Sequence, residues 1–149
     1  MATFRSFEDI DSWNAARQFA QRIYKISSEG AFSKDYKLRD QINGSSGSIM
    51  DNIAEGFERG GNREFIQFLS VAKGSAGETR SQLYRAFDRG YIAEQELESL
   101  KEEALKISRQ ISALMTYLRN SDLKGTKFVK EPDEPYLSGS SNQTLNQKL

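Results

Sequence analysis

The side chains that most often do chemistry in proteins are scarce in this chain of 149 residues. The chain has no histidine and no cysteine, which excludes histidine bases, thiolate nucleophiles and the Glu-x-x-His metal pairs used by some helical bundles. Carboxylates can bind Mg²⁺ or Ca²⁺, but acids near a helix start are also favoured by the helix dipole. The chain has a cluster of closely spaced acids, which we call the acidic cluster: Glu94, Glu96, Glu98, Glu102 and Glu103. We interpret this cluster as a solvated helix face, and we expect no metal site and no cofactor.

The segment Ala72-Lys-Gly-Ser75 has residue types of a phosphate-binding loop but not their order. Such a loop needs Gly-Lys-Ser/Thr, a glycine five residues earlier and a preceding strand, and the segment meets none of these requirements. We interpret the small residues from Gly74 to Gly77 as sites where helices pack closely.

Asn52 and Glu78 are polar residues at the borders of apolar helix faces. At about 100° per residue, Asn52 lies roughly 60° from the centre of its apolar stripe, and Glu78 directly precedes the inward-facing Thr79. Polar groups at a core border need hydrogen-bond partners, so we expect Asn52, Glu55 and Glu78 to form a structural network. The alternative is a ligand or catalytic pocket. No base, nucleophile or metal-ligand set accompanies these residues, so we expect no enzyme and no catalytic residues.

Four segments repeat apolar residues at the three- and four-residue spacing of a helix. The segments span about residues 8–28, 33–57, 62–88 and 93–119. The second contains Asn43-Gly-Ser-Ser-Gly-Ser48, which favours a loop, but its apolar phase continues unbroken, so we predict one helix with a close neighbour there. Short connections make successive helices antiparallel. The sequence thus predicts an all-α, antiparallel up-down-up-down four-helix bundle in residues 1–120, and a polar, disordered tail in residues 121–149.

Apolar residues outside the predicted core stripes indicate self-association. In the first segment, Trp13, Ala20 and Tyr24 form the stripe predicted to face the core, and a second stripe lies about 80–140° away. A four-helix monomer buries one broad stripe per helix, so the remaining apolar residues would form exposed patches. The expected interface residues are Phe19, Ile23, Ile26, Ile66, Val71 and Leu105.

The charge pattern gives little support for a nucleic-acid partner. The chain has 21 Lys+Arg and 21 Asp+Glu, whereas nucleic-acid binding domains are usually basic. Of the consecutive blocks of thirty residues, residues 61–90 alone carry more bases than acids. We expect weak, salt-sensitive binding at most. The candidate contacts are Arg63, Lys73, Arg80, Arg85 and Arg89.

Nothing in the sequence indicates export or membrane insertion. Acidic residues lie within the first ten residues, where a signal peptide would place its apolar core. No stretch approaches the roughly 18 apolar residues of a membrane span. We expect a cytoplasmic protein with no membrane contact.

The string Asn52-Ile-Ala-Glu-Gly56 resembles the core motif of the bacterial 23S rRNA intervening-sequence proteins, a family usually described as four-helix bundle proteins. Matches to Phe7-Glu-Asp-Ile10, to the segment 63–75 and to Arg89-Gly-Tyr-Ile92 follow the family's order, and the resemblance covers about residues 4–119. It implies a bundle that forms a homopentameric ring. A related branch, the accessory protein of diversity-generating retroelements, is a basic pentamer that binds nucleic acid and a reverse transcriptase. Where the family typically has Arg and Ala, this chain has Asn43-Gly-Ser45, which weakens the carry-over of nucleic-acid binding.

These observations lead to two functional hypotheses. The first is a non-enzymatic, oligomeric assembly or interaction module of this family type, which binds copies of itself and an unknown protein partner. The alternative is a weak, sequence-nonspecific RNA- or DNA-binding protein. A basic face on the folded bundle would favour the nucleic-acid-binding hypothesis. The sequence of four helices of mixed charge does not show whether such a face forms.

Overall fold

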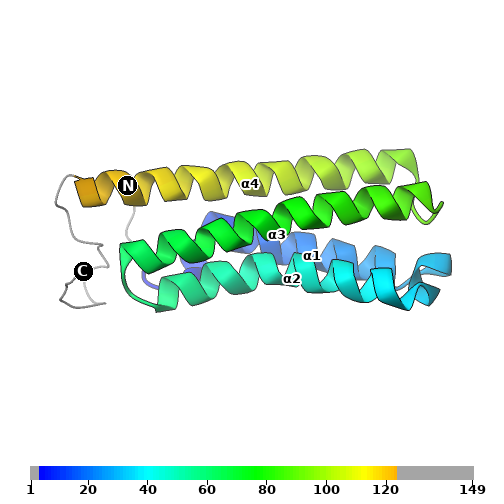
Figure 1. The fold of residues 1–149 in the computed structure, drawn as a ribbon, viewed down its shortest axis with the longest axis horizontal. Coiled ribbons are helices and arrows are strands. Elements are labelled where there is room, and N and C mark those ends of the chain that lie inside the picture. The colour runs from blue at the N-terminus through cyan, green and yellow to red at the C-terminus, as the bar shows by residue number, and fades with distance from the viewer. Residues whose placement is uncertain (1–3, 124–149) are drawn as a thin grey trace.

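The chain folds as four long helices packed side by side along one axis (Figure 1). The computed structural model describes residues 4–123. Each helix reverses the direction of the one before it, and α1 lies behind α2 and α3 in the view of Figure 1. The predicted all-α four-helix bundle is therefore confirmed. Of the predicted tail, residues 121–123 belong to the last helix, and residues 124–149 lie outside the described part. The elements are η1 (Phe7–Asp9), α1 (Asp11–Ser27), η2 (Gly30–Lys34), α2 (Tyr36–Glu58), α3 (Asn62–Asp88) and α4 (Glu94–Leu123).

A continuous apolar core runs between the four helices, and every helix contributes to it. Phe19, Ile49, Phe65 and Leu100 are examples of large side chains with almost no exposed surface. Burying one such side chain contributes roughly 1.5–3 kcal/mol to folding. In the described residues, no helix is both long and apolar enough to cross a membrane.

The face of α1 that packs into the core differs from the predicted one. Phe19 and Ile23 are fully buried, whereas Tyr24 is 62% exposed, so the prediction that Phe19 and Ile23 lie on the surface is wrong. Both candidate stripes have helical spacing. The choice follows from chemistry, because phenylalanine and isoleucine are wholly apolar while the tyrosine hydroxyl can stay in water.

Helix α2 runs unbroken through Asn43–Ser48, as predicted. The reason given for its small residues is wrong, however, because a Cβ added at Gly44 or Gly47 would meet no atom within 4 Å. The same holds for Gly74 and Gly77 of α3. Gly56 differs, since a Cβ there would lie 2.6 Å from the Phe68 Cβ. Close approach of α2 and α3 therefore explains Gly56 but not the other four glycines.

Polar side chains end the helices in ways that the sequence only partly predicts. The carboxylate of Asp9 accepts hydrogen bonds from the backbone amides of Arg5 and Ser6. It therefore stabilises the start of η1 and does not cap α1. Asn62 is the first residue of α3, and its side-chain amide donates to the Leu118 carbonyl at 3.3 Å. Gly90 follows α3 with a φ of 78°, the left-handed conformation that favours glycine after a helix end.

Candidate functional site

The middle of the α2–α3 contact contains a line of polar side chains, which we call the polar seam. Ser45, Ser75, Thr79 and Gln82 are buried within it, although they lie between two otherwise apolar helix faces. Burying such groups costs free energy unless they are hydrogen-bonded, and each of them is. The polar seam consists of Ser45, Ser48 and Asn52 of α2 and Ser75, Glu78, Thr79 and Gln82 of α3.

One half of the seam is a relay of hydrogen bonds that starts at Thr79. The Ser45 and Thr79 hydroxyls lie 2.8 Å apart, and Ser45 donates to Gln82 Oε1 at 2.6 Å. The Thr79 hydroxyl also donates to the Ser75 carbonyl at 2.9 Å, so each of the two hydroxyls contacts the other and a carbonyl oxygen. The Gln82 amide then donates to the Glu78 carboxylate at 3.3 Å. The relay thus leads from a buried hydroxyl to an exposed carboxylate.

The other half of the seam is centred on Ser48. Its hydroxyl accepts from the Ser75 hydroxyl at 2.9 Å and from the Asn52 amide at 2.8 Å. Asn52 also donates to the Ser48 carbonyl at 2.8 Å. Asn52 and Glu78 therefore belong to one seam through different partners. Glu55 lies outside it and pairs with Arg59 at 2.8 Å, with both side chains more than half exposed.

The seam holds two helices together and contains no arrangement for activating a nucleophile. A serine or threonine hydroxyl needs an adjacent base for that purpose. Within residues 4–121, no such hydroxyl is hydrogen-bonded to a carboxylate, since Glu78 contacts the Gln82 amide instead. Sequence reasoning missed Ser75 and Gln82, although their positions four residues before and three residues after Thr79 place all three on one helix face.

Asp35 forms a second polar cluster, at the end of the bundle where η2 and the α3–α4 connection meet. Its carboxylate accepts from the Leu38 amide at 3.2 Å, Arg89 at 2.9 Å and the Tyr91 hydroxyl at 2.8 Å. The Tyr91 ring stacks on Phe32 with centroids 5.2 Å apart. The Tyr91 hydrogen bond, followed by the Leu38 amide, lowers the pKa of Asp35, and the same hydrogen bond raises the pKa of Tyr91.

This cluster predicts an acid-sensitive contribution to stability. Because the pKa of Asp35 is lower in the folded state than its ordinary value of 3.8, the contribution is complete above that value and is lost as the pH falls through the folded-state pKa. Asp35→Asn should therefore lower the melting temperature at pH 7 and lose less further stability on acidification to pH 2. Melting curves across this range would measure both effects. The control is Asp40→Asn, which removes an exposed carboxylate paired with Arg39 and should change the melting temperature at pH 7 little.

The five basic residues predicted to contact nucleic acid do not form one patch. At about 100° per residue, Lys73 and Arg80 project from one side of α3 and Arg85 and Arg89 from another. Arg85 donates to Gln41 at 3.2 Å, and Arg89 is bound to Asp35. Arg63 is exposed at the start of α3.

Three of the five acids in the acidic cluster of α4 form surface ion pairs. Glu98 pairs with Lys101, Glu102 with Arg109, and Glu103 with Arg22 of α1. In the described part of the chain, no three carboxylates gather where they could hold a metal ion.

The predicted interface residues other than Phe19 and Ile23 lie nearer the surface. Val71 is 53% exposed. Ile26 and Ile66 are partly buried against the core, and Leu105 has intermediate exposure. Tyrosines that the sequence analysis did not select are also prominent on the surface, namely Tyr24, Tyr36 and Tyr84.

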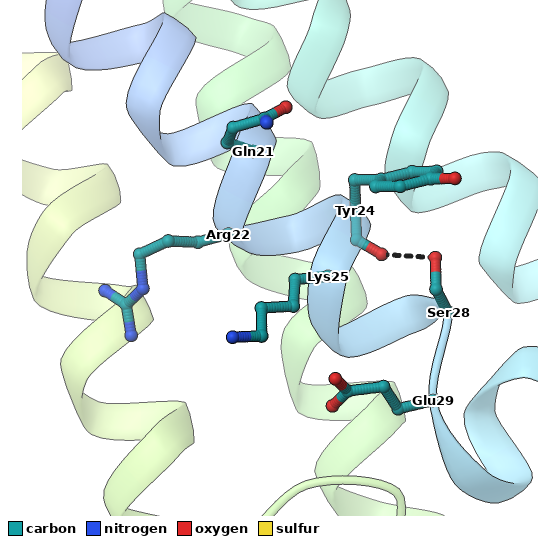
Figure 2. A pocket seen from close by; sticks show the side chains of 6 residues that line it. All are labelled: Gln21, Arg22, Tyr24, Lys25, Ser28 and Glu29. Carbon is teal, nitrogen blue, oxygen red and sulfur yellow. Dashed lines mark hydrogen bonds between the residues drawn. The ribbon is translucent and has the colours of Figure 1, made fainter.

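The outer side of α1 bears a shallow hollow of about 450 Å³, lined by Gln21, Arg22, Tyr24, Lys25, Ser28 and Glu29. Figure 2 shows Arg22 and Lys25 extending toward one side of α1 and Tyr24 toward the other. The Ser28 hydroxyl donates to the Tyr24 carbonyl at 2.6 Å and holds the end of the helix.

Comparisons with known proteins agree with this fold. One solved structure, from Bacteroides thetaiotaomicron, is described as a protein of unknown function from the S23 ribosomal protein family. It is 26% identical, with a TM-score of 0.64, and the match covers 70% of this chain and 95% of that one. Curated proteins gave no match. The model of the 23S rRNA-intervening sequence protein family matches residues 8–113. The chain therefore belongs to the 23S rRNA-intervening sequence protein family.

Proposed function

We propose that this protein is a non-enzymatic assembly module that acts in the cytoplasm by binding copies of itself and a further protein. The observation that carries the proposal is the set of large side chains left on the surface of a bundle whose core is already complete. Tyr24, Tyr36, Val71 and Tyr84 are between 44% and 63% exposed. Large exposed apolar and aromatic side chains are typical of surfaces that bind other proteins.

The chemistry of the described residues supports a binding role rather than catalysis. The buried hydroxyls of the polar seam are occupied by contacts between α2 and α3. The chain also has no histidine or cysteine to serve as base or nucleophile. Resemblance to the family suggests a ring of five copies, which closes when one surface of each copy binds a different surface of the next.

Light scattering coupled to size-exclusion chromatography tests the proposed self-association. We expect a particle of five times the 16.9 kDa chain mass at micromolar concentration, because several buried apolar side chains per contact, each worth roughly 1.5–3 kcal/mol, can hold such an assembly. A 16.9 kDa species would overturn the oligomer. A dimer or tetramer would overturn the number five and leave the assembly role standing.

The alternative, weak nucleic-acid binding, predicts a different result in a titration. The candidate basic residues are spread around α3 and two of them are engaged within the bundle. We therefore expect dissociation constants weaker than about 1 μM for RNA and duplex DNA at physiological salt, with affinity falling as salt rises. Submicromolar binding would make nucleic acid the primary partner.

A further inference from the structure

Four glycines in the middle of α2 and α3 have no role inside the monomer. A glycine in a helix interior destabilises it by roughly 0.5–1 kcal/mol relative to alanine, and nothing lies within 4 Å of a Cβ placed at any of the four. Gly47 and Gly74 directly precede Ser48 and Ser75, whose hydroxyls are hydrogen-bonded between the helices, so they lie at the same height along the bundle. We call this surface the glycine face. It consists of Gly44, Gly47, Gly74 and Gly77.

The α2 side of the glycine face is acidic. Residues 40–58 contain four acids and no lysine or arginine. Asp51, one helical turn after Gly47, and Glu58 form no ion pair within residues 4–121, and both are exposed. Val71, one turn before Gly74, adds an exposed apolar side chain. The α2 part of the glycine face is thus negatively charged, while the α3 part carries the apolar Val71 and the exposed Lys73.

The outer side of α1 has complementary features. Helix α1 carries three basic residues and one acidic residue. Lys25 is exposed and forms no ion pair within the described residues, and the Arg17 guanidinium lies over the Trp13 ring, at the surface. Tyr24 extends toward the other side of α1 from Lys25, and both line the hollow of Figure 2. This side thus presents an aromatic ring and two positive charges.

We propose that the outer side of α1 in one copy docks on the glycine face of a second copy. Tyr24 packs against helix backbone where the glycines leave no side chains, while Arg17 and Lys25 meet Asp51 and its acidic neighbours. Such complementarity steers two surfaces into one orientation. Because the two surfaces differ, the contact is head-to-tail and repeats until a ring closes. The inference rests on the proposed self-association and names the surfaces that make it.

A double variant of the glycine face tests the inference. Gly47→Leu with Gly74→Leu fills the surface that a second copy needs, and the monomer has open space for both side chains. We expect unchanged or raised thermal stability together with at least about a tenfold weaker association. Thr116→Leu, which adds a similar apolar side chain at an exposed position of α4, should leave association unchanged.

Charge-reversal variants test the same contact independently and remain informative if the leucine variant does not fold. Lys25→Glu and Asp51→Lys each replace an exposed residue and should each weaken self-association, because each variant alone places like charges across the contact. A mixture of the two variants should associate more strongly than either variant alone, since opposite charges then face each other wherever a copy of one variant contacts a copy of the other. Variants that assemble as the unaltered chain does would overturn these surfaces and leave the proposed function intact. An unaltered chain that is monomeric would overturn both.

Discussion

Phe19→Ala should lower the free energy of unfolding by about 3–5 kcal/mol. Phe19 has no exposed surface and belongs to the apolar core cluster. Its removal therefore loses both the transfer free energy of the ring and the contacts that its neighbours made with it. Denaturant unfolding followed by circular dichroism would measure the change. The loss is a large part of the roughly 5–15 kcal/mol that stabilises a typical domain.

Two further variants of α1 keep this prediction measurable and specific. Ile23→Val, at another fully buried position, should cost only about 0.5–1.5 kcal/mol and keep the bundle folded. Tyr24→Ala, at a position 62% exposed, should change the stability of the monomer little. If Phe19→Ala and Tyr24→Ala had equal effects on unfolding, the orientation of α1 described above would be incorrect.

Thr79→Val should destabilise the bundle by about 1–3 kcal/mol even though the side chain keeps its shape. The Thr79 side chain is fully buried, and its hydroxyl contacts Ser45 and the Ser75 carbonyl. Valine removes the partner of the Ser45 hydroxyl and the donor to the Ser75 carbonyl at a buried position. Urea unfolding of the variant would measure the loss. Ser81→Ala, at an exposed position of the same helix, is the matched control.

A double-mutant cycle separates the seam's pairing from simple loss of packing. Ser45→Ala alone should also destabilise the bundle, because it leaves Thr79 and Gln82 with fewer partners. Combined with Thr79→Val, it should cost less than the two single changes together, since removing both partners leaves fewer unpaired groups. Strict additivity would show that the Ser45–Thr79 contact contributes no pairing energy.

The fold was predictable because the four apolar repeats are long and their connections short. The orientation of α1 was not, since this helix carries two apolar stripes of helical spacing and only the burial of Phe19 and Ile23 decides between them. The polar seam was predictable in outline from Asn52 and Glu78. Its centre was not, because a serine such as Ser45 can fill a core position only when a partner on another helix satisfies it.

The Asp35 cluster lay beyond the reach of the sequence for a different reason. Its partners Arg89 and Tyr91 are more than fifty residues away along the chain. Local patterns indicate that an aspartate can cap a helix, but they do not indicate which distant side chains will meet it. For the same reason Arg89 was assigned to a nucleic-acid surface instead of to an ion pair inside the fold.

The hydrogen bonds between α2 and α3 also restrict how the bundle can move. They occur at several heights along the helix pair, from Asp35–Arg89 near one end to Ser45–Thr79 and Ser48–Ser75 toward the middle. Sliding one helix past the other by a turn is a displacement of about 5.4 Å, which would break all of them at once. The α2–α3 hairpin therefore has a fixed axial register and behaves as a rigid unit. Rearrangements of the bundle that preserve this unit must take place through movements of α1 and α4.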